Sequence, residues 1–459
     1  MSWWRDGAIY QVYPRSFQDS DGDGTGDLEG VRRRLPYLKW LGVAGVWLSP
    51  FYRSPMADFG YDVSDHCDVD PAFGTLEDFD ALAADAHRLG LKLILDYVPN
   101  HTSIEHPWFR ERPEYYLWAD AVPNDWVSVF GGPAWTRHDD RFYYHAYLEQ
   151  QPDLNWRRED VRAAMLDVLR FWCARGADGF RVDALRQVIK DDRLRENPVN
   201  PEWREGDDPY ARLIPEFTTD RPEVQDVIRG FREAVGPERL LLGELYLPLE
   251  RLVAYYASGL DMPANFHLLT TPWTPRDIAA LVEAYEAALP AGAWPNWVLG
   301  NHDRPRPASR LPPGSERAAA YLLLTLRGTP TLYYGDEIGM RDVAVAPERQ
   351  VDPWAFGNRD GVRTPMQWDA RGSFTTGDPW LPFADDHERV NVAAQRDDPG
   401  SLLSLYRRLL ALRRAERGLR TGAYRIIAAD DRLLRFARGD SIEVTIDFET
   451  GDGSIVRTG

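Results

Sequence analysis

The segment Gly179-Phe180-Arg181-Val182-Asp183-Ala184 has the pattern of a buried strand that carries two opposite charges. Its two large apolar side chains point to one face, while Arg181 and Asp183 point to the other. It follows a helix-like run at residues 161–175. Charges are taken out of water only with partners, and such pairs gather at functional sites. Alone, the pair is equally consistent with a structural salt bridge, so the neighbouring segments decide its meaning.

Apolar strands alternate with amphipathic helices on both sides of this segment. Helical spacing of apolar residues occurs at 28–41 and 76–89. The other strand-like runs lie at residues 8–13, 43–50, 91–98, 240–243, 262–265, 297–300 and 331–334. This alternation predicts a parallel sheet with helices outside it. About eight β-α units over roughly 390 residues predict an α/β protein with a (β/α)8 TIM barrel.

The remaining segments predict additions to this barrel. We expect the barrel to comprise residues 1–100 and 157–420. Between them, residues 101–156 are rich in Trp, Pro, Gly and Tyr and lack a helical period, which predicts a loop-rich inserted subdomain after the third strand. Residues 421–459 alternate in strand fashion and predict a short C-terminal antiparallel β-domain.

The composition excludes several kinds of partner. The formal net charge is −18, from 54 basic and 72 acidic residues, which argues against nucleic acid or an anionic membrane as partner. The 17 Trp and 21 Tyr, several beside acidic residues, suit sugars, although most aromatic residues fill cores. We therefore expect a small carbohydrate partner. The sequence does not specify an oligomeric state.

The cysteines and the N-terminus bear on location. Only Cys67 and Cys173 occur, far apart, so a disulfide framework is not expected and a reduced compartment is. The N-terminus lacks the pattern of a signal peptide, and no apolar run approaches the roughly 20 residues of a membrane helix. These features predict a soluble, cytoplasmic protein.

An acidic loop near the N-terminus predicts a calcium site. The segment Asp19-Ser20-Asp21-Gly22-Asp23-Gly24-Thr25-Gly26-Asp27 fits the pattern D-x-D-x-D-G-x-x-D. Gly30 stands where an EF-hand has its glutamate, and the flanks are not paired helices, so the loop is not an EF-hand. The alternative is a solvated acidic turn, in which the aspartates would repel one another. The predicted ligands of a structural Ca²⁺ are Asp19, Asp21, Asp23, Thr25 and Asp27. No organic cofactor is expected.

Acidic and polar residues close several non-adjacent strands of the predicted barrel. The active-site groups of such barrels lie at the C-terminal ends of the strands. The residues at these ends are Asp96, Asn100 and His101 after the third strand, Arg181 and Asp183 on the fourth, Glu244 after the fifth, and His302 and Asp303 after the seventh. Three acids converging on one mouth would destabilise one another in a purely structural role. They indicate a catalytic site.

These segments resemble the α-amylase family of glycoside hydrolases (family 13), in its α-glucosidase and oligo-1,6-glucosidase branch. The resemblance covers nearly the whole chain. The segments that carry it are Asp96-Tyr97-Val98-Pro99-Asn100-His101, Gly179-Phe180-Arg181-Val182-Asp183, Gly243-Glu244, Asn301-His302-Asp303, Gln151-Pro152-Asp153-Leu154-Asn155 and Arg363-Thr364-Pro365-Met366-Gln367-Trp368.

The resemblance implies a role for each matching residue. Asp183 is similar to the nucleophile and Glu244 to the general acid/base. Asp303 is similar to the acid that forms hydrogen bonds with the sugar hydroxyls. Arg181 would keep Asp183 ionised, whereas Glu244 needs a raised pKa to act as a proton donor at neutral pH. Asp96 is expected to hold Arg181. The expected substrate-binding residues are Asp58, Tyr61, His101, Tyr147, Arg181, His302 and Arg363.

The resemblance also implies the reaction and leaves alternatives. It implies an exo-acting α-glucosidase that works with retention through a covalent β-glucosyl-enzyme ester. Ala184 follows the nucleophile, where the branch has valine with α-1,6 substrates and threonine or alanine with α-1,4 substrates. This implies a preference for short α-1,4 glucosides or a broad tolerance of linkages. The inserted segment is also shorter than in the branch. A transglucosylase, sucrose isomerase or trehalose-forming enzyme would use the same intermediate. A non-catalytic relative, such as a transporter heavy chain, would lack the acids.

Overall fold

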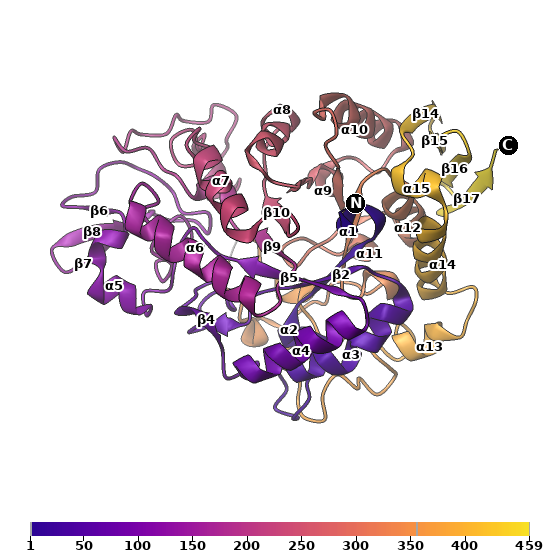
Figure 1. Cartoon of the computed structure of the whole chain (residues 1–459), viewed down its shortest axis with the longest axis horizontal. Helices are drawn as coiled ribbons and strands as arrows, with labels where there is room; N and C mark the ends of the chain where they lie inside the picture. The colour runs from indigo at the N-terminus through magenta and orange to yellow at the C-terminus, as the bar shows by residue number, and fades with distance from the viewer. Residues whose placement is uncertain (1, 355–356, 459) are drawn as a thin grey trace.

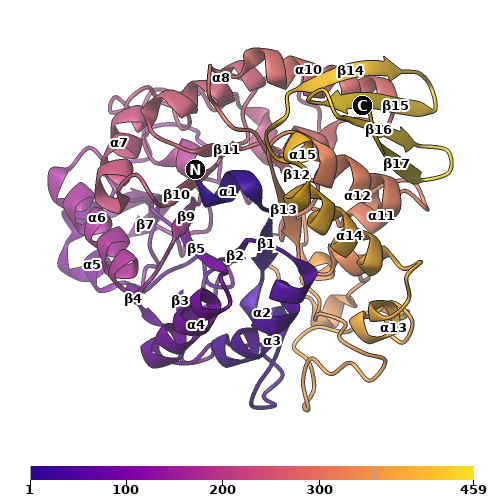
Figure 2. The ribbon, with the colours of Figure 1, turned by 45° about the vertical axis from the view of Figure 1, so that its right-hand side comes forward.

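Eight parallel strands form the central sheet of the protein. The structure, a computed structural model, describes residues 2–354 and 357–458. The strand order is β11-β10-β9-β5-β2-β1-β13-β12, and β11 also contacts β12, so the sheet closes into a barrel (Figure 2). The strands are β1 (Ile9–Val12), β2 (Gly45–Leu48), β5 (Lys92–Tyr97), β9 (Gly179–Val182), β10 (Leu240–Glu244), β11 (Met262–Ala264), β12 (Asn296–Val298) and β13 (Thr329–Tyr333). The predicted (β/α)8 barrel is confirmed.

Helices surround the barrel and bury its outer face (Figure 1). The longer ones are α3 (Leu28–Leu41), α4 (Leu76–Arg88), α6 (Glu159–Ala174), α7 (Val224–Val235), α10 (Pro275–Ala288), α12 (Glu316–Thr325) and α14 (Leu402–Ala415). Short helices are α1 (Trp3–Asp6), α2 (Pro14–Phe17), α5 (Pro107–Glu111), α8 (Leu249–Val253), α9 (His267–Thr270), α11 (Pro307–Arg310), α13 (Val392–Arg396) and α15 (Arg417–Thr421). Because helices cover the outside, strands such as β1, β2 and β13 are buried along their whole length.

The segment after β5 builds a small sheet of its own. Its strands are β6 (Trp118–Ala119), β7 (Trp135–His138) and β8 (Arg141–Tyr144), paired antiparallel in the order β6-β8-β7. Trp126, Trp135 and Tyr144 form a separate apolar cluster beneath it. A short hairpin of β3 (Tyr52–Arg53) and β4 (Asp65–Val69) precedes this segment in the chain. These two additions stand at the mouth of the barrel and supply walls for the site described below.

Four antiparallel strands end the described chain. They are β14 (Tyr424–Ala429), β15 (Leu433–Arg438), β16 (Ile442–Asp447) and β17 (Asp452–Arg457), in sequential order. One face packs on α10 and α12 (Figure 2), and its buried Leu434, Phe436 and Val444 join the main core. The other face carries charged pairs such as Arg435–Glu443. The predicted C-terminal antiparallel β-domain is confirmed.

Two findings bear on the predicted compartment. Both Cys67 and Cys173 are free thiols, as the sequence predicts. Among residues 2–354 and 357–458, no helix has both the length and the apolar character needed to cross a bilayer.

Candidate active site

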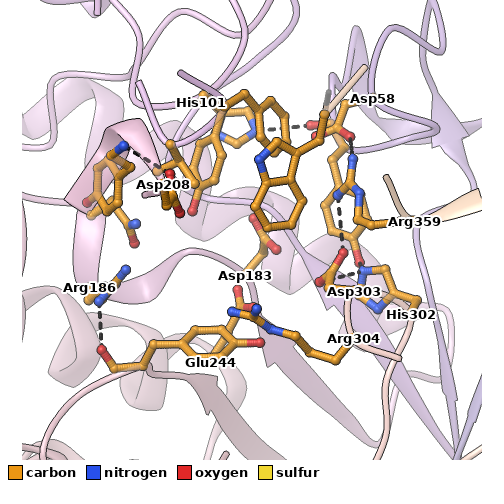
Figure 3. Close-up of a pocket in the computed structure, with 18 residues that line it drawn as sticks. Asp58, His101, Asp183, Arg186, Asp208, Glu244, His302, Asp303, Arg304 and Arg359 are labelled. Atoms are coloured by element: carbon orange, nitrogen blue, oxygen red, sulfur yellow. Dashed lines mark hydrogen bonds and ion pairs between the residues drawn. The ribbon is translucent and has the colours of Figure 1, made fainter. Parts of the chain in front are cut away.

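The strand ends meet at a single pocket (Figure 3). Asp183 directly follows β9, Glu244 ends β10, and His302 and Asp303 follow β12, so three different strands contribute to one wall. The lining residues are Asp58, Tyr61, His101, Val129, Phe130, Tyr147, Asp183, Arg186, Gln187, Asp208, Tyr210, Glu244, Tyr246, His302, Asp303, Arg304, Trp354 and Arg359. The convergence that the sequence predicts is therefore present.

Arg181 links three carboxylates at the base of this pocket. Its Nη1 lies 2.8 Å from Asp96 Oδ1 and 2.6 Å from Asp183 Oδ1. Its Nη2 lies 2.9 Å from Glu244 Oε1. The side chains of Arg181 and Asp96 are 2% and 0% exposed, whereas those of Asp183 and Glu244 are 10% and 12% exposed. Arg181 therefore holds two carboxyl groups that face the pocket side by side, and Asp96 holds Arg181 from behind, as expected.

One guanidinium does not balance three desolvated carboxylates. Burial raises the pKa of Asp183 well above its ordinary value, Arg181 opposes this, and the nearby Glu244 adds to it. Burial also raises the pKa of Asp96 to about 6, again against the effect of Arg181. The cluster thus favours keeping a proton. Arg181 lowers the pKa of Asp183, although burial, the larger effect, raises it.

Ala184 turns the chain sharply after the strand. Its φ of 47° and ψ of 29° lie in the left-handed region, which non-glycine residues rarely adopt. In this conformation its backbone N–H donates to Glu244 Oε2 at 2.9 Å. Non-glycine residues held in such conformations cluster at functional sites. The turn therefore fixes the second oxygen of the carboxyl whose first oxygen binds Arg181.

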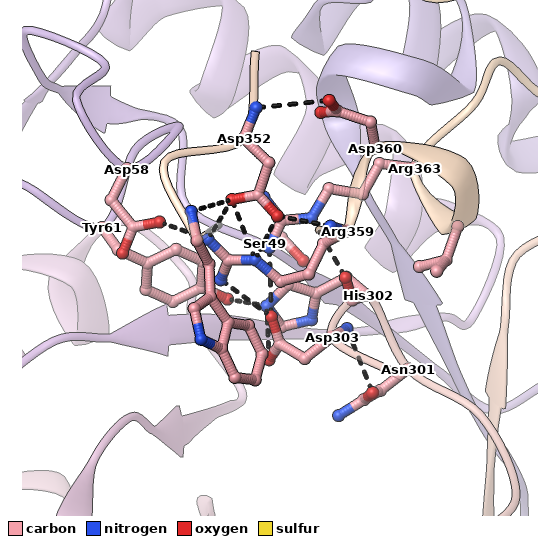
Figure 4. A network of polar contacts seen from close by, with 12 residues as sticks. Ser49, Asp58, Tyr61, Asn301, His302, Asp303, Asp352, Arg359, Asp360 and Arg363 are labelled. Carbon is pink, nitrogen blue, oxygen red and sulfur yellow. Dashed lines mark hydrogen bonds and ion pairs between the residues drawn. The ribbon is translucent and has the colours of Figure 1, made fainter. Parts of the chain in front are cut away.

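A second arginine, Arg359, lines the pocket and joins several carboxylates in a polar network (Figure 4). Arg359 Nη2 lies 2.8 Å from Asp58 Oδ1, and its Nη1 lies 3.1 Å from Asp303 Oδ1. Asp352 holds the same guanidinium at 2.7 Å from Nη2 and 2.9 Å from Nε. The rings of Phe130 and Trp354 lie 5.2 Å and 5.7 Å from its centre. Three segments that are distant in sequence are thereby tied into one wall.

His302 and three arginines surround Asp303 and keep it ionised. Burial alone would raise the pKa of Asp303, but His302, Arg359 and Arg363 together lower it far below its ordinary value. Arg363 Nη2 lies 3.0 Å from Asp303 Oδ1, and its Nε donates to the backbone carbonyl of His302 at 3.0 Å. Burial lowers the pKa of His302, so this imidazole is neutral at ordinary pH. The pocket therefore pairs a charged acceptor with a neutral ring.

Most of the residues predicted for the pocket line it, and two lie behind it. Asp58, Tyr61, His101, Tyr147, His302 and the three catalytic candidates face the cavity. Arg181 and Arg363 do not line it; they act through the carboxylates that they bind. Sequence reasoning missed Arg359 and the far side of the pocket, formed by Arg186, Asp208, Tyr210, Tyr246 and Arg304. These stand in loops and in short 3-10 turns, which are too short to show a periodic pattern. The motif that identified Arg363 begins four residues after Arg359.

The acidic loop gathers three of its predicted ligands. Oxygen atoms of Asp19, Asp21 and Asp27 lie within 4.8 Å of one another, while Asp23 is not part of this group. Both Asp19 oxygens accept backbone N–H bonds, for example from Gly22 at 2.7 Å. Asp27 also caps α3, since its Oδ1 accepts from the N–H of Gly30 at 2.6 Å. The loop geometry and the start of α3 thus depend on the same carboxylates.

The barrel, its inserted segment and the three acids at its mouth define a glycoside hydrolase of the α-amylase type. The family model for the alpha amylase catalytic domain matches residues 11–422, and the chain belongs to this family. It is 41% identical to a probable alpha-glucosidase of Rhizobium meliloti, over 96% of this chain and 88% of the relative. It is 38% identical to Maltase 1 of Drosophila virilis, over 95% and 76%.

Solved structures agree with this assignment. An alpha-glucosyl transfer enzyme superposes with a TM-score of 0.94 at 39% identity and covers 98% of this chain and 91% of its own. The trehalulose synthase of Pseudomonas mesoacidophila MX-45 superposes with a TM-score of 0.89 at 32% identity, with coverage of 98% and 91%. Proteins of this one fold are therefore named for the hydrolysis of glucosides in some cases and for the transfer of glucose in others.

Proposed function

We propose that this enzyme is a retaining, exo-acting α-glucosidase that releases α-glucose from short α-glucosides. The observation that carries the proposal is the pair of carboxyl groups, Asp183 and Glu244, that bind the two ends of one guanidinium and face one pocket. Retaining glycosidases need two carboxyl groups about 5 Å apart, so that one can attack the anomeric carbon while the other protonates the leaving oxygen. The relatives named α-glucosidase and maltase support the same substrate class.

The chemistry proceeds in two displacements. A carboxylate oxygen of Asp183 forms a bond to C1 while the bond from C1 to the leaving oxygen breaks, and Glu244 gives its proton to that oxygen. Arg181 and the backbone N–H of Ala184 hold the two oxygens of Glu244 in place for this proton transfer. Glu244 then takes a proton from water, whose oxygen attacks C1 and releases Asp183 as a carboxylate. Two inversions at C1 leave the α-configuration of glucose unchanged.

The closed end of the pocket supports exo action. Asp58, Arg359 and Asp303 present charged acceptors and donors to the hydroxyls of one terminal sugar. A charged acceptor such as ionised Asp303 strengthens its hydrogen bonds as the ring gains positive charge in the transition state. The rings of Phe130 and Trp354 flank the guanidinium and add apolar walls at this end. Ala184 supports a preference for α-1,4 linkages, as the family pattern implies.

Transfer to another sugar is the second candidate function. The leaving-group side carries hydrogen-bonding and aromatic groups that can hold an acceptor while the ester survives: Arg186, Asp208, Tyr210, Tyr246 and Arg304. The superposition on enzymes named for glucosyl transfer and trehalulose synthesis supports this alternative. A non-catalytic role is disfavoured because all three acids are retained.

Product analysis distinguishes these functions. Maltose, isomaltose, sucrose and trehalose are supplied at low and at high concentration, and products are followed by NMR from the first minute. We expect glucose in the α-form first and maltose consumed fastest. Initial release of β-glucose would refute retention. If rearranged disaccharides were the main product from sucrose at low concentration, the enzyme would be an isomerase rather than a hydrolase.

Calcium at the acidic loop is a proposed structural cofactor. Asp19, Asp21 and Asp27 fit the ion because their oxygens converge within 4.8 Å on a turn shaped by backbone N–H bonds. Asp23 and the backbone or side chain of Thr25 remain further proposed ligands. A bound ion would offset the repulsion among the aspartates and stabilise the entry to α3. The predicted cytoplasmic location stays a prediction.

A further inference from the structure

We propose that Gln11 is a positioning residue that fixes the tautomer of His302, with the ring proton on Nε2. The inference rests on the proposed function for its kinetic consequence, but its central statement concerns a proton on one nitrogen. Gln11 lies on β1, is fully buried and does not line the pocket. No part of the proposed reaction uses it directly.

The partners of Nε2 require a proton on that nitrogen. His302 Nε2 lies 3.2 Å from Asp303 Oδ2, and an ionised carboxylate only accepts hydrogen bonds. The same Nε2 lies 2.8 Å from the hydroxyl of Tyr61. That hydroxyl donates its single hydrogen to Asp96 Oδ2 at 3.1 Å, so it receives a hydrogen bond from the ring. Both neighbours therefore demand a donor at Nε2.

The other ring nitrogen must then accept. A neutral imidazole carries one proton, so Nδ1 of His302 presents a lone pair when Nε2 is protonated. Gln11 Nε2 lies 2.8 Å from this Nδ1, and its second amide hydrogen reaches Ser49 Oγ at 3.1 Å. An amide turned the other way would set its carbonyl oxygen against the lone pair. The amide group of Gln11 thus stabilises one tautomer and penalises the other.

The surroundings of His302 leave few other ways to set its proton. Tyr61 stacks on one face at 5.4 Å and 4°, and Tyr13 stacks at 6.0 Å, so the ring cannot turn. The charged groups nearest to the ring are Asp303, Arg181, Arg359 and Arg363. The three arginines disfavour a doubly protonated ring, and Asp303 favours a proton on its own side. Gln11 supplies the donor at Nδ1.

The consequence is a hydrogen-bond donor aimed at the sugar site. With the proton on Nε2, His302 supports Asp303 and can donate to a sugar hydroxyl that replaces Tyr61 as its partner. With the proton on Nδ1, a lone pair on Nε2 would face the Asp303 carboxylate. The ring would then repel Asp303 and could not donate to the sugar hydroxyl. Removal of the partner that holds a metal-bound histidine in one tautomer costs roughly 10- to 100-fold in activity or affinity, and we expect an effect on this scale here.

The test compares Gln11→Met, Gln11→Glu and Ser49→Ala in the full chain. Methionine keeps the length of the side chain and removes both donors, while S49A removes only the second partner of the amide. We expect kcat/KM on p-nitrophenyl α-glucoside to fall about 10- to 100-fold in Q11M and to change little in S49A. We expect the Q11E carboxylate to accept a hydrogen bond from a protonated Nδ1, which raises the pKa of His302, so that both nitrogens are protonated near neutral pH.

Nitrogen NMR of ¹⁵N-histidine-labelled protein reads the tautomer directly, with the His302 signal assigned by its loss in His302→Gln. We expect Nε2–H in the wild type and in S49A, both nitrogens protonated in Q11E, and mixed tautomers in Q11M. A wild-type ring protonated at Nδ1 would overturn the proposal, as would an unchanged tautomer in Q11M. If the tautomers behave as expected but none of the glucosides is cleaved, the proposed function fails and the assignment of Gln11 stands.

Discussion

Replacing Arg359 by lysine separates the geometry of one guanidinium from its charge. In the wild type, three nitrogens of Arg359 bind the carboxylates of Asp58, Asp303 and Asp352 at distances from 2.7 to 3.1 Å. A lysine has one nitrogen and cannot hold all three in one plane. We expect R359K to release at least one of the two pocket carboxylates from its fixed position.

The size of the effect follows from the bonds that are lost. A hydrogen bond to a charged group contributes about 1.5–3 kcal/mol, so a misplaced Asp58 or Asp303 lowers kcat/KM roughly 10- to 150-fold. Arg359→Met removes the charge as well. Since Arg359 helps to lower the pKa of Asp303, that pKa rises in R359M, and activity that needs ionised Asp303 is lost at a higher pH as the pH falls.

The assay is kcat/KM on p-nitrophenyl α-glucoside from pH 4 to 8, with thermal unfolding measured in parallel. Arg349→Lys, at an exposed arginine of the same loop region, is the matched control. We expect R349K to match the wild type. The reasoning is refuted if R359K and R359M both keep kcat/KM within twofold of the wild type at neutral pH.

Three further predictions address the catalytic pair, linkage and calcium. Asp183→Asn and Glu244→Gln should each lower turnover on p-nitrophenyl α-glucoside by orders of magnitude with unchanged circular dichroism; activity retained in both would disprove the assignment. Ala184→Val should raise the ratio of kcat/KM on isomaltose to kcat/KM on maltose about tenfold, within the roughly 1–3 kcal/mol that one added group can contribute. It should also lower the melting temperature, because a β-branched residue disfavours a φ of 47°. An unchanged ratio would contradict the linkage argument. EDTA should lower the melting temperature more than the initial rate, and an identical melting curve would remove the calcium proposal.

Some parts of the site were open to prediction because they follow regular elements. Asp183 and Glu244 stand at strand ends, and parallel strands place their carboxyl ends at one edge. The rest depends on loops with no period. Arg359 lies far along the chain from Asp58, and only the folded loop brings them to 2.8 Å. The position of Arg363 could be predicted from its motif, but not its place behind Asp303 rather than in the pocket.

The sequence by itself determined the barrel, the order of its strands and helices, and the acids at its mouth. It could do so because side-chain periodicity and strand ends are local properties of the chain. The tertiary structure alone decided how charge is shared. Arg181 faces three carboxylates and burial outweighs it at Asp183, while His302 and three arginines outweigh burial at Asp303. Desolvation and distance set these balances, and both exist only after distant segments have packed together.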